Sequence, residues 1–346
     1  MAKPLVLVTG ASGFLASHII SLLLAEGYAV RGTARPGKME SLRAAPIADN
    51  LDFSLVQIDD IATSDLSGAL KDVDYIIHAA SPLAGKASPQ ETLQTAKNGT
   101  LNVLASALKA GVSKVVLTSS WATTQDPSLE KTYQGVVFSE KDWSSVSEEE
   151  FLKGDHDVLW GYLAIKTLVE KVAWEFAQEN PTLDLATINP PFMYGPINTN
   201  FPPPMPDRLN ANILTYSLIS GEPERPLLSI QLPPFYCDVR DVARAHVKAL
   251  TLKRFEPPEK KRFLVSGGHF RWKEAVEYLE KSRPDLKSRL PPVTGSSFQE
   301  LPGELSSIDV TRARDILHME EYIGWENTIG DTISSLLITE EIWARN

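Results

Sequence analysis

The residues whose types and spacing could perform chemistry lie in two segments near the middle of the chain. Tyr162 and Lys166 are four residues apart, and a helix would place both on one face. A phenol has a pKa of about 10, and a nearby ammonium group can lower that pKa by about 1–3 units. Tyr162 could therefore act as a general acid. Ser119 and Ser120 follow an apolar run, and either hydroxyl could polarise a carbonyl group.

A glycine-containing segment near the N-terminus gives this pair a context. It follows an apolar run and opens a helix-like pattern. Gly10 would let the chain turn out of the strand, Gly13 would let the backbone approach a pyrophosphate, and Ala16 is small enough for close helix–strand packing. The positive end of the helix would stabilise the phosphate charge. The segment predicts a dinucleotide-binding loop.

The end of the second strand-like run indicates which dinucleotide would bind. Enzymes that use NAD usually carry Asp or Glu here to hold the ribose 2′-hydroxyl. This chain instead has Arg31 and Arg35, with Lys38 close behind and no acidic residue between Gly27 and Lys38. The Arg35 guanidinium could pair with a 2′-phosphate, an interaction worth roughly 1.5–3 kcal/mol. We expect NADP(H) to be preferred by about tenfold to a hundredfold; the alternative is that both arginines are solvated surface charges.

Alternating elements must position these residues. Strand-like apolar runs alternate with helix-period segments through the first half of the chain, which predicts an α/β fold with a Rossmann-type doubly wound parallel sheet. The expected strands are residues 4–9, 28–33, 52–57, 74–78, 114–118 and 183–188, and the expected helices are residues 14–26, 64–71, 88–110 and 158–179.

The pattern changes after Pro190, where residues 189–207 carry seven prolines. Beyond them we expect helices near residues 208–220, 240–252, 271–282 and 326–341, and strands near Tyr236 and at 262–265. The segment 236–252 could rejoin the large sheet. We therefore divide the chain into a dinucleotide-binding domain of residues 1–190, which residues 234–265 rejoin, and a smaller C-terminal substrate-binding domain of residues 191–233 and 266–346.

Composition excludes several classes of function. The net charge of −10 argues against a general nucleic-acid or membrane-surface binder. The single cysteine, Cys237, excludes an intramolecular disulfide and a cysteine-based metal cluster, and we expect no metal. We see neither a secretory signal nor an apolar run long enough to span a bilayer, so we expect a cytoplasmic protein.

Taken in this order, the motifs resemble those of the extended short-chain dehydrogenases/reductases. The similarity is greatest to the dihydroflavonol-reductase-like branch, which includes plant reductases and fungal carbonyl or methylglyoxal reductases. It extends over roughly residues 4–270. Trp121 follows the serine pair where smaller residues are usual, and the cysteine-containing motif of cinnamoyl-CoA reductases is absent near residues 133–143. The matching pieces are residues 9–16, 30–35, 60–61, 78–82, 99–104, 118–120, 162–166, 189–190 and 238–243.

The resemblance implies roles for individual residues. Ser120 aligns with the catalytic serine of the family, with Ser119 as the fallback, and acts with Tyr162 and Lys166. Asp60 and Ile61 would contact the adenine. The implied cofactor-binding residues are Gly10, Ser12, Gly13, Phe14, Leu15, Arg35, Lys38, Asp60, Ile61, Ala79, Ala80, Ser81, Thr118, Tyr162, Lys166, Pro190, Phe192 and Met193.

A mostly aromatic set of side chains is expected to form the substrate pocket, which favours a small apolar or aromatic carbonyl compound. The proline-rich stretch 198–212 is either a lid that closes over this pocket or a rigid surface connection. The candidate pocket residues are Trp121, Tyr133, Phe192, Met193, Phe201, Ile213 and Tyr216.

The expected activity is NADPH-dependent reduction of a ketone or aldehyde to an alcohol, with Tyr162 as the proton donor. One alternative is a nucleotide-sugar epimerase or dehydratase, but such an enzyme needs basic groups for a diphosphate, and residues 191–233 offer only Arg208 and Arg225. The other alternative is a non-catalytic NADP(H) sensor, which would have no need of Ser120, Tyr162 and Lys166 together.

Overall fold

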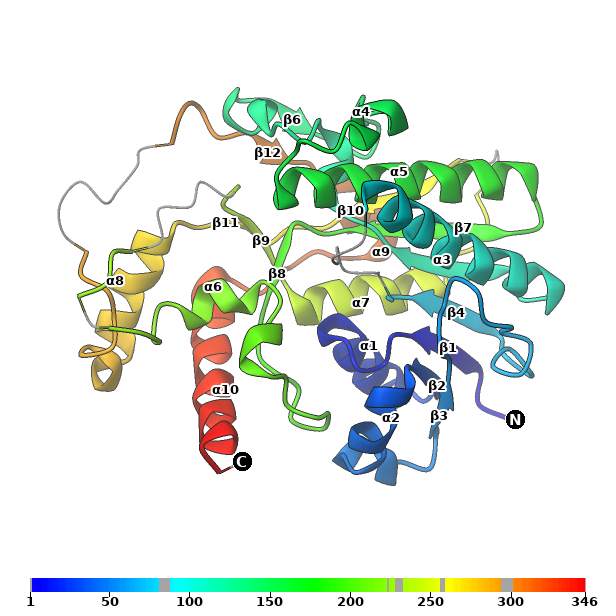
Figure 1. The fold of residues 1–346 in the computed structure, drawn as a ribbon, viewed down its shortest axis with the longest axis horizontal. Helices are drawn as coiled ribbons and strands as arrows, with labels where there is room; N and C mark the ends of the chain where they lie inside the picture. The colour runs from blue at the N-terminus through cyan, green and yellow to red at the C-terminus, as the bar shows by residue number, and fades with distance from the viewer. Residues whose placement is uncertain are drawn as a thin grey trace.

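A seven-stranded parallel sheet forms the centre of the computed structural model, which describes residues 2–80, 88–222, 224–227, 233–255, 259–293 and 301–345 (Figure 1). The strand order is β10-β7-β5-β4-β1-β2-β3. The order reverses direction between β1 and β4, as in a doubly wound sheet, so the predicted Rossmann-type fold is confirmed. The strands are Leu5–Thr9 (β1), Ala29–Ala34 (β2), Phe53–Gln57 (β3), Tyr75–His78 (β4), Lys114–Thr118 (β5), Asp184–Asn189 (β7) and Lys261–Leu264 (β10).

Helices cover both faces of this sheet. Phe14–Ala25 (α1) and Val239–Leu250 (α7) pack against each other on one face, and Pro89–Lys109 (α3) and Val158–Glu179 (α5) pack on the other (Figure 1). Successive residues of β1 point to opposite faces, so Val6 and Val8 join the core under α1 and α7 while Leu7 joins the core under α3 and α5. This two-sided burial explains why the central strands β1, β4 and β5 are mainly apolar.

Two expected helices differ in the structure. Residues 64–71 form turns, because the Asp65 side chain accepts from the Ser67 amide (2.9 Å) and hydroxyl (2.8 Å), and Asp72 takes a left-handed conformation with φ 60°. Within the expected helix 208–220 only Asn212–Tyr216 (α6) is α-helical, and Arg208 ends a short 3-10 helix, Pro206–Arg208. The helices that were not predicted include Pro36–Arg43 (α2), which begins directly after Arg35, and Thr311–Leu317 (α9).

A separate three-stranded sheet organises the C-terminal part of the chain, and its order is β11-β9-β8. The expected strand near Tyr236 is β9, and it pairs with β8 and β11 instead of joining the large sheet. The large sheet is completed by β10, which pairs with β7, and α7 packs beneath it. The elements of this region are Phe192–Tyr194 (β8), α6, Phe235–Asp238 (β9), Gly268–His269 (β11), Trp272–Ser282 (α8) and Trp325–Arg345 (α10).

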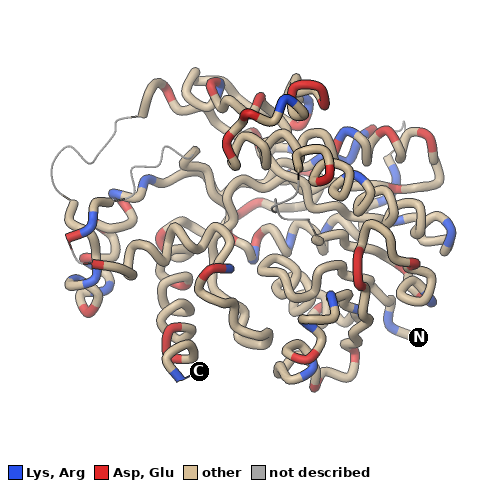
Figure 2. Tube along the Cα trace, in the orientation of Figure 1, with Lys and Arg blue, Asp and Glu red and all other residues tan. Residues whose placement is uncertain are grey.

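A small two-stranded sheet joins the segment after the serine pair to the late part of the chain. Val137–Phe138 (β6) pairs in parallel with Ser307–Ile308 (β12), which leads into Thr311–Leu317 (α9). The short helix Glu148–Leu152 (α4) precedes α5. Acidic and basic positions are interspersed along the outer elements, which fits the expectation against a nucleic-acid binder (Figure 2). In the part of the chain that the structure describes, no helix has the length and apolar character needed to cross a membrane.

Candidate active site

The loop between β1 and α1 has the geometry of a phosphate-binding turn. Gly10 has φ +73°, and a Cβ atom there would lie 3.1 Å from Ala80 Cα. A Cβ atom on Gly13 would lie 3.1 Å from the Gly10 carbonyl oxygen, and Gly13 caps α1 without any side-chain hydrogen bond. The helix therefore presents its first-turn N–H groups, at Phe14 and Leu15, without a side-chain cap, and a pyrophosphate fits such a site. Ser12 is exposed in the same turn.

The two arginines near the end of β2 have different surroundings. Arg31 Nη1 donates to the carbonyl oxygens of Ala69 (2.8 Å) and Lys71 (2.7 Å), so this side chain holds the turn before β4. Arg35 is exposed at the start of α2, and no hydrogen bond or ion pair joins its guanidinium to the residues that the structure describes. Lys38 lies in the first turn of the same helix. The surroundings of Arg35 fit the 2′-phosphate of NADP(H), whereas Arg31 has a structural role.

The residues expected around the adenine, Asp60 and Ile61, lie in the turn that follows β3. The Asp60 carboxylate accepts from the Ala62 amide at 2.9 Å and shapes this turn. Asn102 Nδ2, on α3, holds this turn by donating to the Ile61 carbonyl oxygen at 2.9 Å.

The cofactor-binding residues expected after β4 are Ala79, Ala80 and Ser81. The amide of Ala80 donates to Thr9 Oγ1, at the end of β1, at 3.1 Å. Ser81 lies outside the described residues.

Tyr162 and Lys166 lie in the second and third turns of α5. The helix begins at Asp157, whose side chain accepts from the Trp160 amide at 2.8 Å. Lys166 Nζ lies 6.0 Å from the centroid of the Tyr162 ring. Burial lowers the pKa of Lys166 to about 8, and the Glu170 charge opposes this shift.

The pKa of Tyr162 shifts in the direction opposite to our expectation. Tyr162 is 38% exposed as a residue, but desolvation of its phenolate raises the pKa of Tyr162 to about 12. Lys166 does not offset this effect in the structure. Tyr162 is therefore protonated over the whole physiological range, which is the form that an acid in a reduction requires.

The adjacent serines are bound differently. Ser119 is buried, and its hydroxyl donates to Glu170 Oε2 at 2.5 Å. Ser120 is half-buried, and its Oγ accepts from the Ala122 amide at 3.1 Å, which leaves its proton available. This geometry favours Ser120 as the residue that polarises a substrate oxygen.

Thr118, at the end of β5, is held by His246 of α7, which covers the face of the sheet opposite to α5. His246 Nδ1 is 2.8 Å from the Val242 carbonyl oxygen, and its Nε2 is 2.8 Å from Thr118 Oγ1. A carbonyl oxygen only accepts, so Nδ1 carries the proton and Nε2 accepts from Thr118. Burial lowers the pKa of His246 to about 4, which keeps the ring neutral. The Thr118 hydroxyl is thereby fixed.

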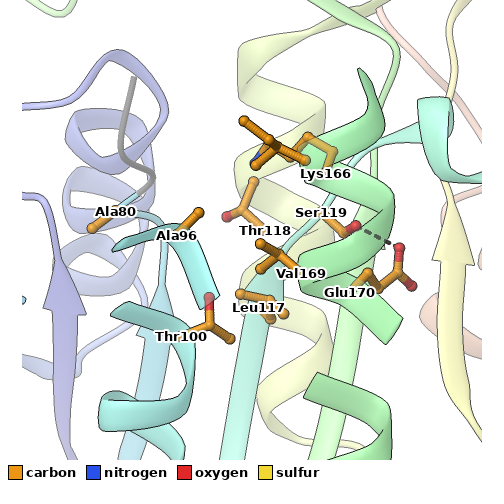
Figure 3. Close-up of a pocket in the computed structure, with 10 residues that line it drawn as sticks. Ala80, Ala96, Thr100, Leu117, Thr118, Ser119, Lys166, Val169 and Glu170 are labelled. Carbon is orange, nitrogen blue, oxygen red and sulfur yellow. Dashed lines mark hydrogen bonds between the residues drawn. The ribbon is translucent and has the colours of Figure 1, made fainter. Parts of the chain in front are cut away.

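A cavity of about 20 Å³ lies between α3, β5 and α5, directly beside Lys166 (Figure 3). Its walls include Ala80, Ala96, Thr100, Thr118 and Glu170. This volume is enough for about one water molecule. The cavity thus borders the side chains expected to meet the cofactor.

Of the expected pocket residues, Trp121, Phe192 and Met193 flank Pro190. The Trp121 amide donates to the Pro190 carbonyl oxygen at 2.9 Å, and Phe192 and Met193 form the start of β8. The Trp121 indole is only 3% exposed and packs edge-on against Phe138 and Phe235, with centroid distances of 5.5 and 5.1 Å. It therefore forms part of the wall behind the site.

Phe201 lies in the apolar cluster around β1 and α1, whereas Tyr216 packs against the same apolar cluster as Phe192. Phe201 is buried and packs against Phe53 of β3, at a centroid distance of 6.5 Å. Tyr216 packs against Trp343 of α10 at 5.6 Å. The structure therefore does not bring these two side chains to Trp121. Tyr133 is half-buried and its hydroxyl has no partner among the described residues, while Ile213 is exposed on α6.

The stretch 198–212 is anchored at three points. Asn198 Nδ2 donates to the Ser17 carbonyl oxygen of α1 at 3.0 Å, and the Asn200 carbonyl accepts from the Ile47 amide at 3.0 Å. The Pro204 carbonyl accepts from Trp343 Nε1 at 2.9 Å. These contacts favour the rigid alternative in the state that the structure describes.

Sequence reasoning missed the polar residues behind the site. Glu170, Arg262 and His246 are all buried; Glu170 and His246 are bonded to groups at strand ends, and Arg262 is bonded to Glu170. One feature of the sequence could have identified Glu170, because it continues the four-residue spacing of Tyr162 and Lys166 along the helix. Arg262 could not have been identified, since its partners are distant in sequence.

Comparison with known proteins identifies the family. Residues 6–264 match the NAD dependent epimerase/dehydratase family. The chain belongs to this family. The resemblance to the extended short-chain dehydrogenases/reductases is thereby confirmed.

Two relatives and one solved structure cover almost the whole chain. The NADPH-dependent methylglyoxal reductase GRE2 of Saccharomyces cerevisiae is 32% identical over 96% of this chain and 98% of its own length. The ketoreductase azaE of Aspergillus niger is 32% identical over 96% of this chain and 97% of its own. The crystal structure of yeast methylglyoxal/isovaleraldehyde reductase Gre2 complexed with NADPH superposes with a TM-score of 0.81 and 30% identity, covering 97% of this chain and 99% of that one.

Proposed function

We propose that this protein uses NADPH to reduce a ketone or aldehyde to an alcohol, with Tyr162 as the proton donor. The observation that carries the proposal is the placement of Ser120, Tyr162 and Lys166 at the carboxyl end of β5, the edge at which α/β sheets bind ligands. The uncapped start of α1 lies at the same edge.

Each of these side chains has a distinct task in the proposed reaction. Ser120 donates its free proton in a hydrogen bond to the substrate carbonyl oxygen. Tyr162, which stays protonated because its pKa is about 12, transfers its proton to that oxygen as negative charge develops there. The Lys166 ammonium lies 6.0 Å from the centroid of the Tyr162 ring and does not lower the pKa of Tyr162 in the structure; its proposed task is to stabilise the phenolate that forms when NADPH and substrate are bound. NADPH supplies the hydride when it is bound.

Cofactor choice rests on Arg35. Its guanidinium has no partner among the described residues, lies at the end of β2, and can form a bidentate pair with a 2′-phosphate. The relatives named as NADPH-dependent reductases support the same cofactor. Their substrates, methylglyoxal and isovaleraldehyde, support a small carbonyl compound as the substrate class.

The two arginines of the segment 191–233 do not favour a nucleotide-sugar substrate. Arg225 uses its guanidinium to bind the carbonyl oxygens of Ser217, Glu222 and Arg289, and Arg208 is exposed beside Asp207. Within the described part of this segment, neither arginine lies free beside the candidate site. An apolar carbonyl compound therefore suits this side of the site better than a diphosphate.

The proposal is tested by NADPH oxidation with a panel of ketones and aldehydes, including aryl and alkyl carbonyls and charged keto acids. We expect the apolar compounds to be reduced faster than the charged ones. Turnover of nucleotide sugars without net NADPH consumption would instead indicate an epimerase. NADPH binding without turnover of any compound would indicate a sensor.

A further inference from the structure

A cluster of buried polar side chains lies directly behind the catalytic hydroxyl groups. Its centre is the carboxylate of Glu170, which follows Lys166 by four residues and Tyr162 by eight, so the three share one face of α5. Glu170 and Arg262 of β10 have side chains that are each 1% exposed. Arg262 Nε donates to Glu170 Oε1 at 2.9 Å.

The Glu170 carboxylate joins three strands to the helix that carries Tyr162 and Lys166. Its partners come from the end of β5, from β7 and β10, and from α5 itself. The bond to the strand-end serine is drawn in Figure 3. Oε1 accepts from Arg262 Nε, Trp174 Nε1 (3.1 Å) and Thr187 Oγ1 (3.1 Å), and Oε2 accepts from Ser119 Oγ (2.5 Å) and Asn189 Nδ2 (2.8 Å).

The same cluster reaches the backbone around Ser120. Asn189 Nδ2 also donates to the Ser120 carbonyl oxygen at 3.1 Å. Arg262 Nη2 donates to Thr123 Oγ1 at 2.5 Å, and its Nη1 donates to the Glu140 carbonyl oxygen at 2.8 Å. The segment that follows β5 is therefore fastened to Glu170 through both Asn189 and Arg262.

Stability alone does not account for a charged pair in this place. Replacing a buried ion pair by apolar side chains of similar volume is often neutral or stabilising, because burial of two charges costs desolvation energy. The Glu170 carboxylate accepts five hydrogen bonds, one of them from its ion-pair partner, and these bonds fix the geometry of the groups around it. We propose that Glu170 and Arg262 are positioning residues, which hold the Ser120 hydroxyl at a set distance from the Tyr162 hydroxyl although neither touches substrate or cofactor.

This inference rests on the proposed function for the identity of the reacting hydroxyl groups.

The Glu170 carboxylate also affects the charge of Lys166. The titratable groups near Lys166 are Tyr162 and Glu170 on α5 and His78 at the end of β4, while α3 contributes Ala96 and Thr100. Of these, Glu170 raises the pKa of Lys166 against the effect of burial, and the buried neutral His78 contributes no charge.

The test compares Glu170→Gln, which keeps the side-chain size and removes the charge, with Asp184→Asn. Asp184 is a matched control, because it pairs with Lys114 and Lys261 at the opposite end of the same strands. Glu170→Gln is expected to lower kcat by about tenfold to a hundredfold, with NADPH affinity within about threefold of the unmodified protein. Asp184→Asn is expected to lower the melting temperature without changing kcat or its pH profile.

A second readout does not depend on turnover. Lysines are labelled with ¹³C-methyl groups, and the Lys166 resonance is assigned by its loss in Lys166→Arg. Glu170→Gln should move the titration of that resonance to lower pH, whereas Arg262→Lys, which keeps the positive charge, should lower kcat and leave the titration within a few tenths of a pH unit.

The outcomes distinguish a failure of the positioning role of Glu170 and Arg262 from a failure of the proposed carbonyl reduction. A folded Glu170→Gln protein with unchanged kcat and unchanged Lys166 titration overturns the positioning role, and so does an equal loss of kcat in Asp184→Asn. If Glu170→Gln does not fold, the kcat of Arg262→Lys tests the positioning role: a lowered kcat supports this role, and an unchanged kcat overturns it. An unmodified protein that reduces no carbonyl compound, but whose Lys166 titration still depends on Glu170, would contradict the proposed function and leave the coupling intact.

Discussion

Arg31 lies within β2 and Arg35 directly follows this strand, and of their two guanidinium groups only that of Arg31 is bonded to other described residues. Arg31 donates to two backbone carbonyl oxygens, whereas the Arg35 guanidinium is exposed and unpaired among the residues that the structure describes. The two positions therefore give a matched pair of variants for testing cofactor choice.

Arg35→Asp should raise the KM for NADPH far more than the KM for NADH. The lost interaction with the 2′-phosphate is worth roughly 1.5–3 kcal/mol, so the preference for NADPH should fall by about tenfold to a hundredfold. Steady-state kinetics with both cofactors measure this change. Arg31→Gln is the control and should lower stability without altering the preference. Equal use of NADH and NADPH by the unmodified protein would contradict the assignment.

Tyr162→Phe should reduce kcat by about 10²–10⁴-fold, because only the proton donor is removed. NADPH affinity should stay within a few-fold, since the ring remains. Lys166→Ala should weaken both kcat and NADPH binding, because Lys166 is expected to hold the ribose as well. Stopped-flow turnover and NADPH fluorescence titration separate the two effects. A Tyr162→Phe enzyme that retains most of its turnover would rule out Tyr162 as the acid.

The rate of reduction should fall as the pH rises above about 8. The pKa of Tyr162 is about 12, so Tyr162 keeps its proton there, whereas Lys166, with a pKa of about 8, loses its charge. The alkaline limb of kcat/KM therefore reports Lys166 in the free enzyme. Lys166→Arg, provided that it remains active, should have a flat profile up to about pH 10, because an arginine stays charged. A limb that persists in Lys166→Arg would assign the titration to another group.

Stability should fall as the pH drops from about 6.5 to about 4, in part because of His246. Burial lowers the pKa of His246 to about 4, so over this window the unfolded chain binds a proton that the folded protein excludes. The pKa shift of His246 corresponds to a loss of order 3 kcal/mol in the free energy of unfolding over this pH window. Urea unfolding at pH 7 and pH 4.5 should show a smaller loss for His246→Gln than for His269→Gln, a control on the exposed β11. Equal losses in the two variants would show that His246 does not contribute.

The backbone amides of Asn200, Phe201, Arg208 and Asn212 should exchange slowly even without ligand, because each donates a hydrogen bond within a stretch that is anchored to the rest of the protein. Hydrogen exchange with and without NADPH and a substrate analogue measures this. Strong protection that appears only with ligand would establish the lid that the proline-rich sequence allowed.

The elements predicted best are those whose signals are local. The strand before Gly10, the helix after it and the helix of Tyr162 follow from periodicity and turn residues close in sequence. Residues 64–71 were predicted wrongly because side-chain bonds from Asp65 compete with helix formation. Phe201 lies apart from Trp121 because its packing partner, Phe53, is far away in sequence. Composition indicates that a side chain will be buried but not which partners it meets.

The position of β10 has a consequence for how the chain folds. Its partner β7 ends at Asn189, and β10 begins only at Lys261, after the three-stranded sheet has been entered through β8 and β9. During synthesis, β7 is therefore an unpaired apolar edge until about seventy further residues have emerged. Pairing across such a separation is slow, and exposed edges promote aggregation. We expect refolding yields to depend on protein concentration, and a chain ending after β7 to aggregate instead of forming an independent dinucleotide-binding domain.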